Sequence, residues 1–510
     1  MQTSINKEYV IHKWINPNTI EKRRYQDDIA SRAVLRNTLV VIPTGLGKTS
    51  IAAVVCANRL QKDMTKKIMF LAPTKPLVDQ HRNTFEKIMK IGSSELKTVT
   101  GTDPPSTRAL LYNKADVVFS TPQTVANDLK NGMLNFKEFS LLIVDEAHRS
   151  VGNYAYVFVA DQYMKMAKDP LILALTASPG SNKQKIDEIK KKLFIEHVEI
   201  KDRDDEDVRP YVQKQSQAFI HVELIQELRN ISSELSRYRN SIIEMLMSWK
   251  IIHFSKISKV DLLKLQAQLA RSKSGSSLAA MSYIAEILKI DHALILAETQ
   301  TVYALRNYLT SLQEEKSKAA QRLIKSSAFE KAIEITHRLD EYNIEHPKVM
   351  KLKDIIRNEM YRERKVIIFA QYRDTINKLV KELREVEKAK PVGFFGQAKK
   401  AGKGLSQKEQ IEILNEFKLG FYNILVCTSI GEEGLDIAET DTVIFYEPIP
   451  SEIRKIQRAG RTARTKAGKV LVMMTKGTRD EAFYWSGYHK ENKMKSILQR
   501  MKSEQSDNNG

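Results

Sequence analysis

The sequence predicts an α/β protein with two parallel-sheet domains and an all-helical domain between them. Short apolar runs alternate with helical sequence from residue 39 to residue 176, and the same pattern returns from residue 366 to residue 474. Between these regions, from about residue 211 to residue 345, strand signals vanish and apolar residues recur at spacings of three and four. Fully apolar strands that alternate with helices form parallel sheets covered on both faces, whereas the second spacing is typical of amphipathic helices.

Composition and charge limit the classes of protein that this chain can belong to. Its 510 residues are too many for one core, and the net charge of +20 favours a polyanionic partner such as nucleic acid. No apolar run reaches the roughly 18 residues of a membrane span. Residues 1–14 lack the apolar core of a secretion signal, and the only cysteines, Cys56 and Cys427, lie in separate apolar runs. We therefore expect a cytoplasmic protein that does not bind membranes, associated with the nucleoid if its source is prokaryotic.

A glycine-rich stretch after the first apolar run, residues 39–42, has the context of a phosphate-binding loop. Its glycines would bring backbone N–H groups close to phosphates, and the helix that starts at Lys48 would add the positive end of its dipole. Lys48 is placed to reach the β- and γ-phosphates, and the Thr49 hydroxyl to bind magnesium. Ile42 departs from the strict pattern G-x-x-x-x-G-K-[ST], and a plain glycine turn is the alternative. The predicted nucleotide-binding residues are Pro43, Thr44, Gly45, Leu46, Gly47, Lys48 and Thr49.

Polar residues at other points of the first domain extend this predicted site. Gln26 precedes an expected helix at residues 27–35 and is predicted to read adenine through its amide, although a solvated helix start is the commoner meaning. Asp145 directly follows an apolar run and suits a magnesium ligand opposite Thr49, bound directly or through water. Glu146 is placed to orient and deprotonate the attacking water. An Asp-Glu pair that simply starts a helix is the alternative.

The remaining strands of this domain are expected at residues 67–72, 115–120, 140–144 and 171–175.

The charged run at residues 201–207 is interpreted as a solvated linker that closes the first domain. A long amphipathic helix is expected from Leu224 to Trp249, then a Ser/Gly-rich break at residues 272–277, then further helix to Leu339. We predict a nucleotide-binding domain at residues 1–210, a helical domain at 211–345 that binds DNA, a second sheet domain at 346–500 and a polar tail at 501–510.

Strands of the second domain are expected at residues 366–370, 423–427, 442–446 and 470–474. This domain has no phosphate loop of its own, but two polar clusters stand at strand ends or helix starts, residues 428–436 and 457–464. Arg461 and Arg464 in the second cluster lie three residues apart, on one face if the segment is helical. Arginines presented across a cleft are what the transition state at a γ-phosphate needs, although surface arginines are usually only solvated.

The clusters, in this order, resemble the motif set of the superfamily 2 helicases. Asp145 to His148 matches the DEAH spelling of motif II, and motif VI usually has glycine where Ala463 stands. The other matching stretches are residues 43–49 (motif I), 72–80 (Ia), 176–178 (III), 369–375 (IV), 428–436 (V) and 457–464 (VI). The resemblance spans about residues 20–490. It implies two RecA-like motor domains with ATP bound between them.

Three further stretches resemble the helicase portion of archaeal Hef and of the Fanconi-anaemia M translocase: residues 395–398 followed by 404–407, residues 431–436 and residues 476–482. The helical domain occupies the place of that family's inserted DNA-binding domain. The resemblance implies an ATP-dependent DNA helicase or translocase, with magnesium, that acts on forked or four-way DNA in replication or repair alongside other proteins. Archaeal relatives often continue into a nuclease domain. We expect no nuclease activity here.

The resemblance also assigns roles to residues at the matching positions. Gln457, Arg461 and Arg464 would act across the cleft from Lys48, with Gly434 and Asp436 at the nucleotide. Thr176 and Ser178 would couple hydrolysis to the DNA side. The residues expected to hold the phosphodiester backbone are Thr74, Lys75, Gly101, Thr121, Gln123, Gln397 and Thr428.

Two alternatives remain open at the level of sequence. One is an RNA helicase or duplex-RNA translocase of the Dicer/RIG-I kind, which also carries a helical insert. The other is an inactive motor that serves as a nucleic-acid-binding scaffold, against which the intact Lys48, Asp145, Glu146 and Arg464 argue.

Overall fold

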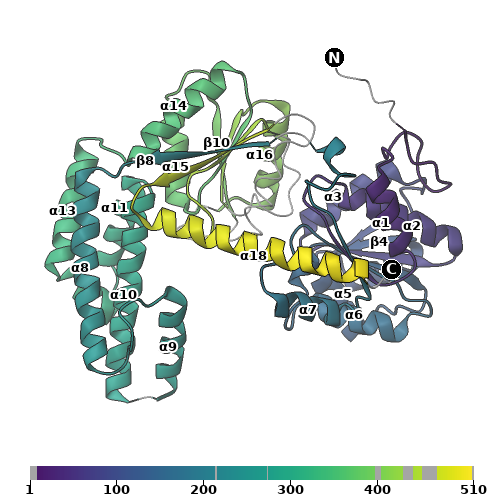
Figure 1. Cartoon of the computed structure of the whole chain (residues 1–510), viewed down its shortest axis with the longest axis horizontal. Helices are drawn as coiled ribbons and strands as arrows, with labels where there is room; N and C mark the ends of the chain where they lie inside the picture. Colours follow the sequence, from purple (N-terminus) through teal and green to yellow (C-terminus); the bar gives the residue numbers. More distant parts are fainter. Residues whose placement is uncertain are drawn as a thin grey trace.

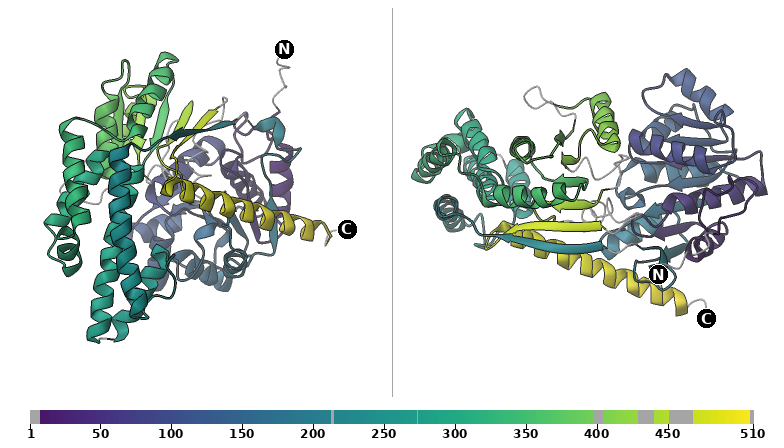
Figure 2. Two further views of the ribbon diagram at one scale, coloured as in Figure 1. Left: turned by 60° about the vertical axis from the view of Figure 1, so that its left-hand side comes forward. Right: turned by 90° about the horizontal axis from the view of Figure 1, so that it is seen from above.

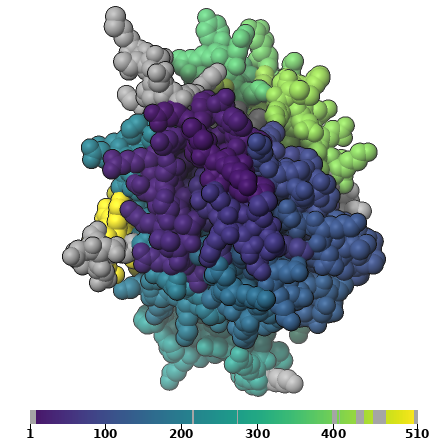
Figure 3. Space-filling view, turned by 90° about the vertical axis from the view of Figure 1, so that its right-hand side faces the viewer, coloured from purple at the N-terminus to yellow at the C-terminus, as the bar shows by residue number. Residues whose placement is uncertain are grey.

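The computed structural model describes residues 8–212, 215–272, 274–396, 404–428, 440–450 and 468–507. Two sheet-containing lobes lie side by side, and a bundle of long helices stands next to the second lobe (Figure 1). The two parallel-sheet domains with helices between them confirm the predicted fold class. Figure 3 views the molecule from the end of the first lobe, whose residues cover most of that face.

Lobe 1 contains a seven-stranded parallel sheet in the order β3-β4-β2-β5-β6-β1-β7. Successive side chains of the inner strands enter two different cores, one on each face, because a strand directs alternate residues to opposite sides. The strands are β1 (Thr38–Val41), β2 (Lys67–Leu71), β3 (Leu96–Val99), β4 (Val117–Ser120), β5 (Phe139–Val144), β6 (Ile172–Thr176) and β7 (His197–Ile200). The helices are α1 (Arg24–Ala33), α2 (Lys48–Lys62), α3 (Lys75–Ile88), α4 (Pro105–Lys114), α5 (Pro122–Lys130), α6 (Ala155–Met166) and α7 (Lys183–Lys192), with short 3-10 turns η1 (Ala147–Arg149) and η2 (Arg209–Tyr211).

Lobe 2 contains a six-stranded parallel sheet in the order β10-β11-β9-β12-β13-β8. Its strands are β8 (Gln215–Val222), β9 (Val366–Phe369), β10 (Pro391–Phe394), β11 (Ile424–Cys427), β12 (Thr442–Phe445) and β13 (Gly468–Thr475). The described helices of this lobe are α14 (Pro347–Tyr361), α15 (Arg373–Leu383) and α16 (Gln407–Leu419).

The helical domain between the lobes has one continuous apolar core. Its helices are α8 (Gln226–Ser248), α9 (Lys259–Ser272), α10 (Gly275–Thr299), α11 (Val302–Gln313), α12 (Lys318–Ile324) and α13 (Ser327–Glu341). The Ser/Gly-rich break falls where expected, between α9 and α10, and the Ser274 hydroxyl caps α10 by accepting from the Ser277 N–H.

The structure corrects two of the predicted boundaries. Residues 215–222, assigned to the helical segment, form β8, which pairs along its whole length with β13 of lobe 2. Residues 501–507, assigned to a polar tail, are the last turns of the long helix α18 (Arg479–Asp507). This helix leaves lobe 2 and crosses to lobe 1 (Figures 1 and 2), where Leu498 and Met501 pack against the core. Lobe 1 partly buries both side chains, so the polar residues 502–507 extend a helix whose apolar face the other lobe covers.

Candidate nucleotide and nucleic-acid site

The phosphate loop lies between the end of β1 and the start of α2, as predicted. Gly45 and Gly47 both have positive φ angles, 89° and 84°, which residues with a Cβ rarely adopt. A Cβ on Gly47 would lie only 2.3 Å from Nε2 of Gln26. Glycine is therefore required at position 47 by both conformation and space.

Gln26 lies against this loop in a largely buried position. Its Nε2 donates to the carbonyl oxygen of Leu46 at 3.0 Å, and the Tyr25 hydroxyl donates to the same oxygen at 2.8 Å. The NH₂ group of the Gln26 amide thus contacts the loop through the Leu46 carbonyl oxygen. Its predicted contact with adenine stays a prediction.

Asp145 stands directly after β5, close to the loop, and is almost completely buried. One of its oxygens, Oδ2, lies 2.8 Å from Nε2 of His81 on α3, and Tyr156 donates to its carbonyl oxygen at 2.7 Å. Burial raises the pKa of this carboxyl, but His81 and the nearby Lys48 ammonium outweigh it, so the Asp145 pKa lies below its usual value. Asp145 is therefore a carboxylate at neutral pH. His81 was not predicted from the sequence. Its only signal is its position on α3, the helix that follows the predicted strand at residues 67–72.

Glu146 has a left-handed backbone conformation, with φ 51° and ψ 49°. For a residue with a side chain this costs of order 1–2 kcal/mol, and such strain gathers at functional sites. Its Oε2 atom is buried, lies 3.3 Å from Nδ1 of His148, and makes no hydrogen bond with any part of the chain that the structure describes. This carboxylate oxygen can therefore accept a hydrogen bond from a bound molecule.

A chain of contacts runs from Glu146 to the middle of α18. His148 Nδ1 lies 3.2 Å from the Thr176 hydroxyl, which donates to the carbonyl oxygen of Ser178 at 3.0 Å. The Ser178 hydroxyl in turn lies 2.8 Å from the sulfur of Met494 on α18. Thr176 and Ser178 therefore lie between the predicted base and a helix that is anchored in lobe 2. Met494 was not predicted, because the residue that it contacts, Ser178, lies 316 residues earlier in the chain.

The predicted backbone-binding residues of lobe 1 meet at one edge of its sheet. They follow the carboxyl ends of the neighbouring strands β3, β4 and β2, on the same edge as the phosphate loop but on the other half of the sheet. Thr74 and Thr121 are the N-cap residues of α3 and α5, and Lys75 Nζ donates to the Thr102 hydroxyl at 3.3 Å. Gly101 and Gln123 are exposed at the same edge.

Lobe 2 contributes Thr428, which directly follows β11 and is partly exposed. The other predicted residues of lobe 2 lie outside the described residues: Gln397, Gly434, Asp436, Gln457, Arg461 and Arg464. Their roles stay predictions.

Two further features are absent from the described residues. Within the ranges given above, no group of three or more His, Cys, Asp or Glu side chains is arranged to hold a metal ion. Over the same ranges, no helix is long and apolar enough to cross a membrane.

Comparisons with known proteins agree with this arrangement. Residues 23–186 match the DEAD/DEAH box helicase family, and residues 347–466 match the helicase conserved C-terminal domain. Residues 224–343 match a family described as "Putative ATP-dependent RNA helicase, helical bundle". The first match falls on lobe 1 and the second on lobe 2, so both lobes resemble helicase domains.

Among curated relatives, "Putative ATP-dependent RNA helicase MJ1505" of Methanocaldococcus jannaschii is 40% identical over 97% of this chain and 63% of its own length. The ATP-dependent DNA helicase fml1 of Schizosaccharomyces pombe is 33% identical over 93% of this chain and 59% of its own length. The ATP-dependent DNA helicase mph1 of Neurospora crassa is 32% identical over 92% of this chain. The chain spans only 42% of that mph1 protein, so it corresponds to part of each of these relatives.

The crystal structure of the Pyrococcus furiosus Hef helicase domain superposes with a TM-score of 0.72 at 39% identity. The match covers 93% of this chain and all of that one. The chain therefore belongs to the superfamily 2 DEAD/DEAH-box helicases, in the group that includes the Hef helicase domain and the Mph1 and Fml1 helicases.

Proposed function

We propose that the protein is an ATP-dependent DNA helicase or translocase that acts on forked or branched DNA. The observation that carries this proposal is the match over nearly the whole chain to the Hef helicase domain, together with the motif residues that meet at one edge of lobe 1. The fml1 and mph1 relatives, named as DNA helicases, support DNA as the substrate.

In this proposal the triphosphate of ATP binds the loop N–H groups at the start of α2. Lys48 neutralises the β- and γ-phosphates, and its Nζ is held at the loop by donating to the Ile42 carbonyl oxygen at 3.3 Å. Glu146 takes a proton from the attacking water, since its buried Oε2 atom has no hydrogen bond to the described chain and can accept one. Arg461 and Arg464 of lobe 2 stabilise the charge that develops on the transferred phosphoryl group.

The residues present fit a magnesium ion. Asp145 is a buried carboxylate that His81 holds in place at Oδ2, and Thr49 supplies a hydroxyl from the first turn of α2. Hard oxygen ligands of this kind are those that Mg²⁺ prefers. The bound ion would neutralise charge on the phosphates.

For the nucleic acid, lobe 1 supplies the backbone contacts from Thr74, Lys75, Gly101, Thr121 and Gln123, with Gln397 and Thr428 from lobe 2. Such contacts fix position but read little shape. Preference for a fork therefore needs a further surface, and the end of the helical bundle far from lobe 2 provides one (Figure 1).

This surface, the bundle tip, is the loop between α8 and α9 with the outer face of α9. Its exposed basic residues are Lys250, Lys256, Lys259 and Lys264, and Phe254 among them is 76% exposed. Other basic residues of α8 are less available: Arg239 pairs with Asp291 at 2.6 Å, and Arg229 pairs with Glu223 at 3.1 Å. Exposed cations around an exposed aromatic ring are suited to phosphates and an unpaired base.

ATPase stimulation by forked DNA and by duplex RNA of the same length tests the substrate class. We expect strong stimulation by the fork and weak stimulation by RNA, with no turnover in a Lys48→Ala variant that is shown to be folded. Greater stimulation by duplex RNA would favour the RNA helicase alternative. Normal turnover by Lys48→Ala would instead contradict the motor itself.

The bundle tip is tested by Lys250→Gln/Lys256→Gln/Lys259→Gln/Lys264→Gln. Each lost phosphate contact should reduce the slope of log affinity against log salt by about 0.9 on duplex DNA. The fork preference should fall while ATPase stimulated by single strands remains. Lys316→Gln/Lys318→Gln/Lys325→Gln, which removes exposed charge near α12, is the control. An unchanged slope in the first variant would place fork recognition in the lobes.

A further inference from the structure

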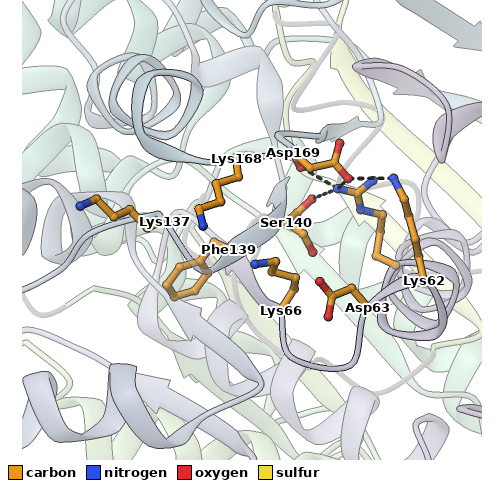
Figure 4. A pocket seen from close by; sticks show the side chains of 9 residues that line it. Lys62, Asp63, Lys66, Lys137, Phe139, Ser140, Lys168 and Asp169 are labelled. Atoms are coloured by element: carbon orange, nitrogen blue, oxygen red, sulfur yellow. Dashed lines mark hydrogen bonds and ion pairs between the residues drawn. The ribbon is translucent and has the colours of Figure 1, made fainter.

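A cavity of about 210 Å³ opens on lobe 1 at the amino ends of its strands, at the opposite edge of the sheet from the phosphate loop (Figure 4). It is lined by the end of α2, the start of β5 and the loop between α6 and β6. From Ser140 in its wall to Asp145 is five residues along β5, roughly 16 Å at about 3.3 Å per residue. The cavity is therefore separate from the nucleotide site.

The lining carries five basic side chains against two carboxylates. Arg59 and Lys62 both bind Asp169, at 3.0 and 2.8 Å, and Arg59 also donates to the Ser140 and Asp169 carbonyl oxygens. The Lys62 hydrogen bond, with Arg59, lowers the pKa of Asp169, so this side chain stays an ionised carboxylate paired with two cations. Arg59, Lys62 and Asp169 therefore bind one another and stabilise the wall of the cavity.

The remaining cations have no such partners. The backbone N–H groups of Lys66 and Lys137 donate to Asp63 and Asn135, but the ammonium groups of Lys66, Lys137 and Lys168 make no hydrogen bond or ion pair to the described parts of the chain. The ammonium groups of Lys66 and Lys168 point toward each other across the cavity beside Phe139, while Lys137 extends to the outer rim (Figure 4). Two like charges that converge in this way repel each other, and an anion between them would remove that cost.

The wall also contains two polar groups that lack partners. Ser140 is 5% exposed, and its hydroxyl makes no hydrogen bond to the part of the chain that the structure describes. Arg59 is 6% exposed, and its Nε atom likewise makes no hydrogen bond to that part of the chain. Buried polar groups are nearly always paired, so two unpaired ones in the wall of one cavity indicate a ligand that completes them.

The size of the cavity limits what it can take. Pockets that bury drug-sized ligands have about 300–1,000 Å³, and this one is smaller. Lysine is a common ligand of phosphate as a point charge. We propose that this cavity is a second anion site of lobe 1, which binds one phosphoryl group between Lys66 and Lys168 over Ser140. The group belongs either to a small phosphate compound or to the backbone of a nucleic acid outside the motor cleft.

Calorimetric titration of the full chain with pyrophosphate tests the site. A Lys48→Ala background removes the main cation of the phosphate loop and leaves this cavity intact. Lys66→Gln/Lys168→Gln should weaken binding at least tenfold, and Ser140→Ala a few-fold. Lys183→Gln/Lys185→Gln, which removes two exposed charges from α7, is the matched control and should change nothing.

Asp63→Asn should change the affinity for pyrophosphate in the opposite direction, because it removes a negative charge from the lining. Asp63 is the one carboxylate of the lining that forms no ion pair within the described structure, and its Oδ1 accepts from the Thr65 N–H at 2.9 Å, a bond that asparagine can keep. This variant should bind pyrophosphate more tightly.

Competition with a short duplex DNA then identifies the source of the phosphate. Displacement of pyrophosphate that depends on Lys66 and Lys168 assigns the site to a nucleic-acid backbone, and lack of displacement assigns it to a small phosphate compound. Pyrophosphate binding that is equal in the parent and the Lys66→Gln/Lys168→Gln variant would overturn the proposal, as would no binding at all. Because neither result depends on ATP turnover, failure here leaves the proposed helicase function untouched.

Discussion

At the scale of single residues, the candidate site is built from side chains whose conformations are constrained before any ligand arrives. Glu146 is held in a left-handed conformation beside His148, and Asp145 is held by His81. Gly47 leaves room for the Gln26 amide. Each constraint fixes a carboxylate beside the phosphate loop or the loop itself, and each can be tested by one substitution.

Glu146→Gln removes the proposed base while keeping side-chain volume. We expect ATP hydrolysis to fall by about 10²–10⁴, the range for a lost general base, while ATP binding and thermal stability remain. Single-turnover hydrolysis and nucleotide titration measure the two properties. Loss of nucleotide binding in a folded Glu146→Gln protein would show that this residue has a structural role.

Gly47→Ala should disrupt the loop more than a positive φ angle alone explains. The strain of a left-handed alanine costs about 1–2 kcal/mol, and the new Cβ also displaces the Gln26 amide. Gly132→Ala is the control, because Gly132 has φ 69° and no atom lies within 4 Å of the place that its Cβ would take. Nucleotide affinity should fall only in Gly47→Ala. Equal affinity in both variants would argue against the role of Gln26 beneath the loop.

At the scale of elements, the helical domain is joined to lobe 2 by buried polar contacts at the end of α10. His346 caps α14 by accepting from the Lys348 N–H at 3.2 Å, and its Nε2 lies 3.1 Å from the Glu298 carbonyl oxygen. Lys348 lies 2.5 Å from Asp480 at the start of α18, and both side chains are fully buried. This junction ties α10, α14 and α18 together.

His346 should make folding sensitive to acid. Burial, with the nearby Lys348 charge, lowers its pKa to about 3, whereas the unfolded chain binds the proton near the ordinary value of 6.5. Between these values the unfolded state holds more protons, so stability rises with pH, by up to about 1.4 kcal/mol per unit, and this contribution is constant above 6.5. Denaturant unfolding from pH 4 to pH 8 measures it.

The control for this prediction is His346→Asn, which can keep the cap without titrating. The slope between pH 4 and 6.5 should be shallower in that variant. An identical slope in both proteins would mean that other groups cause the acid sensitivity.

At the scale of the whole molecule, α18 is the element that touches all three parts. Arg479 pairs with Glu298 of the helical domain, Gly487 packs so closely on lobe 2 that a Cβ would lie 2.6 Å from the Ile449 carbonyl oxygen, and Lys502 pairs with Asp205 of lobe 1. A cavity of about 350 Å³ remains between α18 and the strand ends of lobe 1, next to Pro43 and Ala177. We therefore expect a change in the relative position of the lobes to alter the contacts of this helix.

Met494→Asp/Leu498→Asp should detach α18 from lobe 1. Full burial of an apolar side chain contributes about 1.5–3 kcal/mol; Met494 is buried and Leu498 partly buried, and a carboxylate at either position would oppose that burial. We expect DNA-stimulated ATPase to fall while ATP binding to lobe 1 persists. Glu491→Gln/Lys495→Gln, on the same stretch of the helix, tests whether the apolar contacts matter more than the charges. Unchanged stimulation in the first variant would mean that α18 does not couple the lobes.

Local patterns in the chain were enough to predict the fold class, the phosphate loop, the acidic pair after β5 and the break between α9 and α10. Such features are encoded by apolar runs, by glycines at fixed offsets and by charges at strand ends. The strands that these patterns did not predict, β3, β7, β8 and β10, are the four edge strands of the two sheets. Edge strands have a neighbour on one side only and carry more polar residues, so their pattern is weak.

The packing of the elements, in contrast, determines which distant residues meet. His81 reaches Asp145 from a helix 64 residues earlier, Met494 reaches Ser178 across the two lobes, and β8 joins a sheet whose other strands come more than 140 residues later. The lysines around Ser140 also come from separate elements. A contact between residues far apart in the chain depends on how the elements pack, and a local pattern carries no record of that packing.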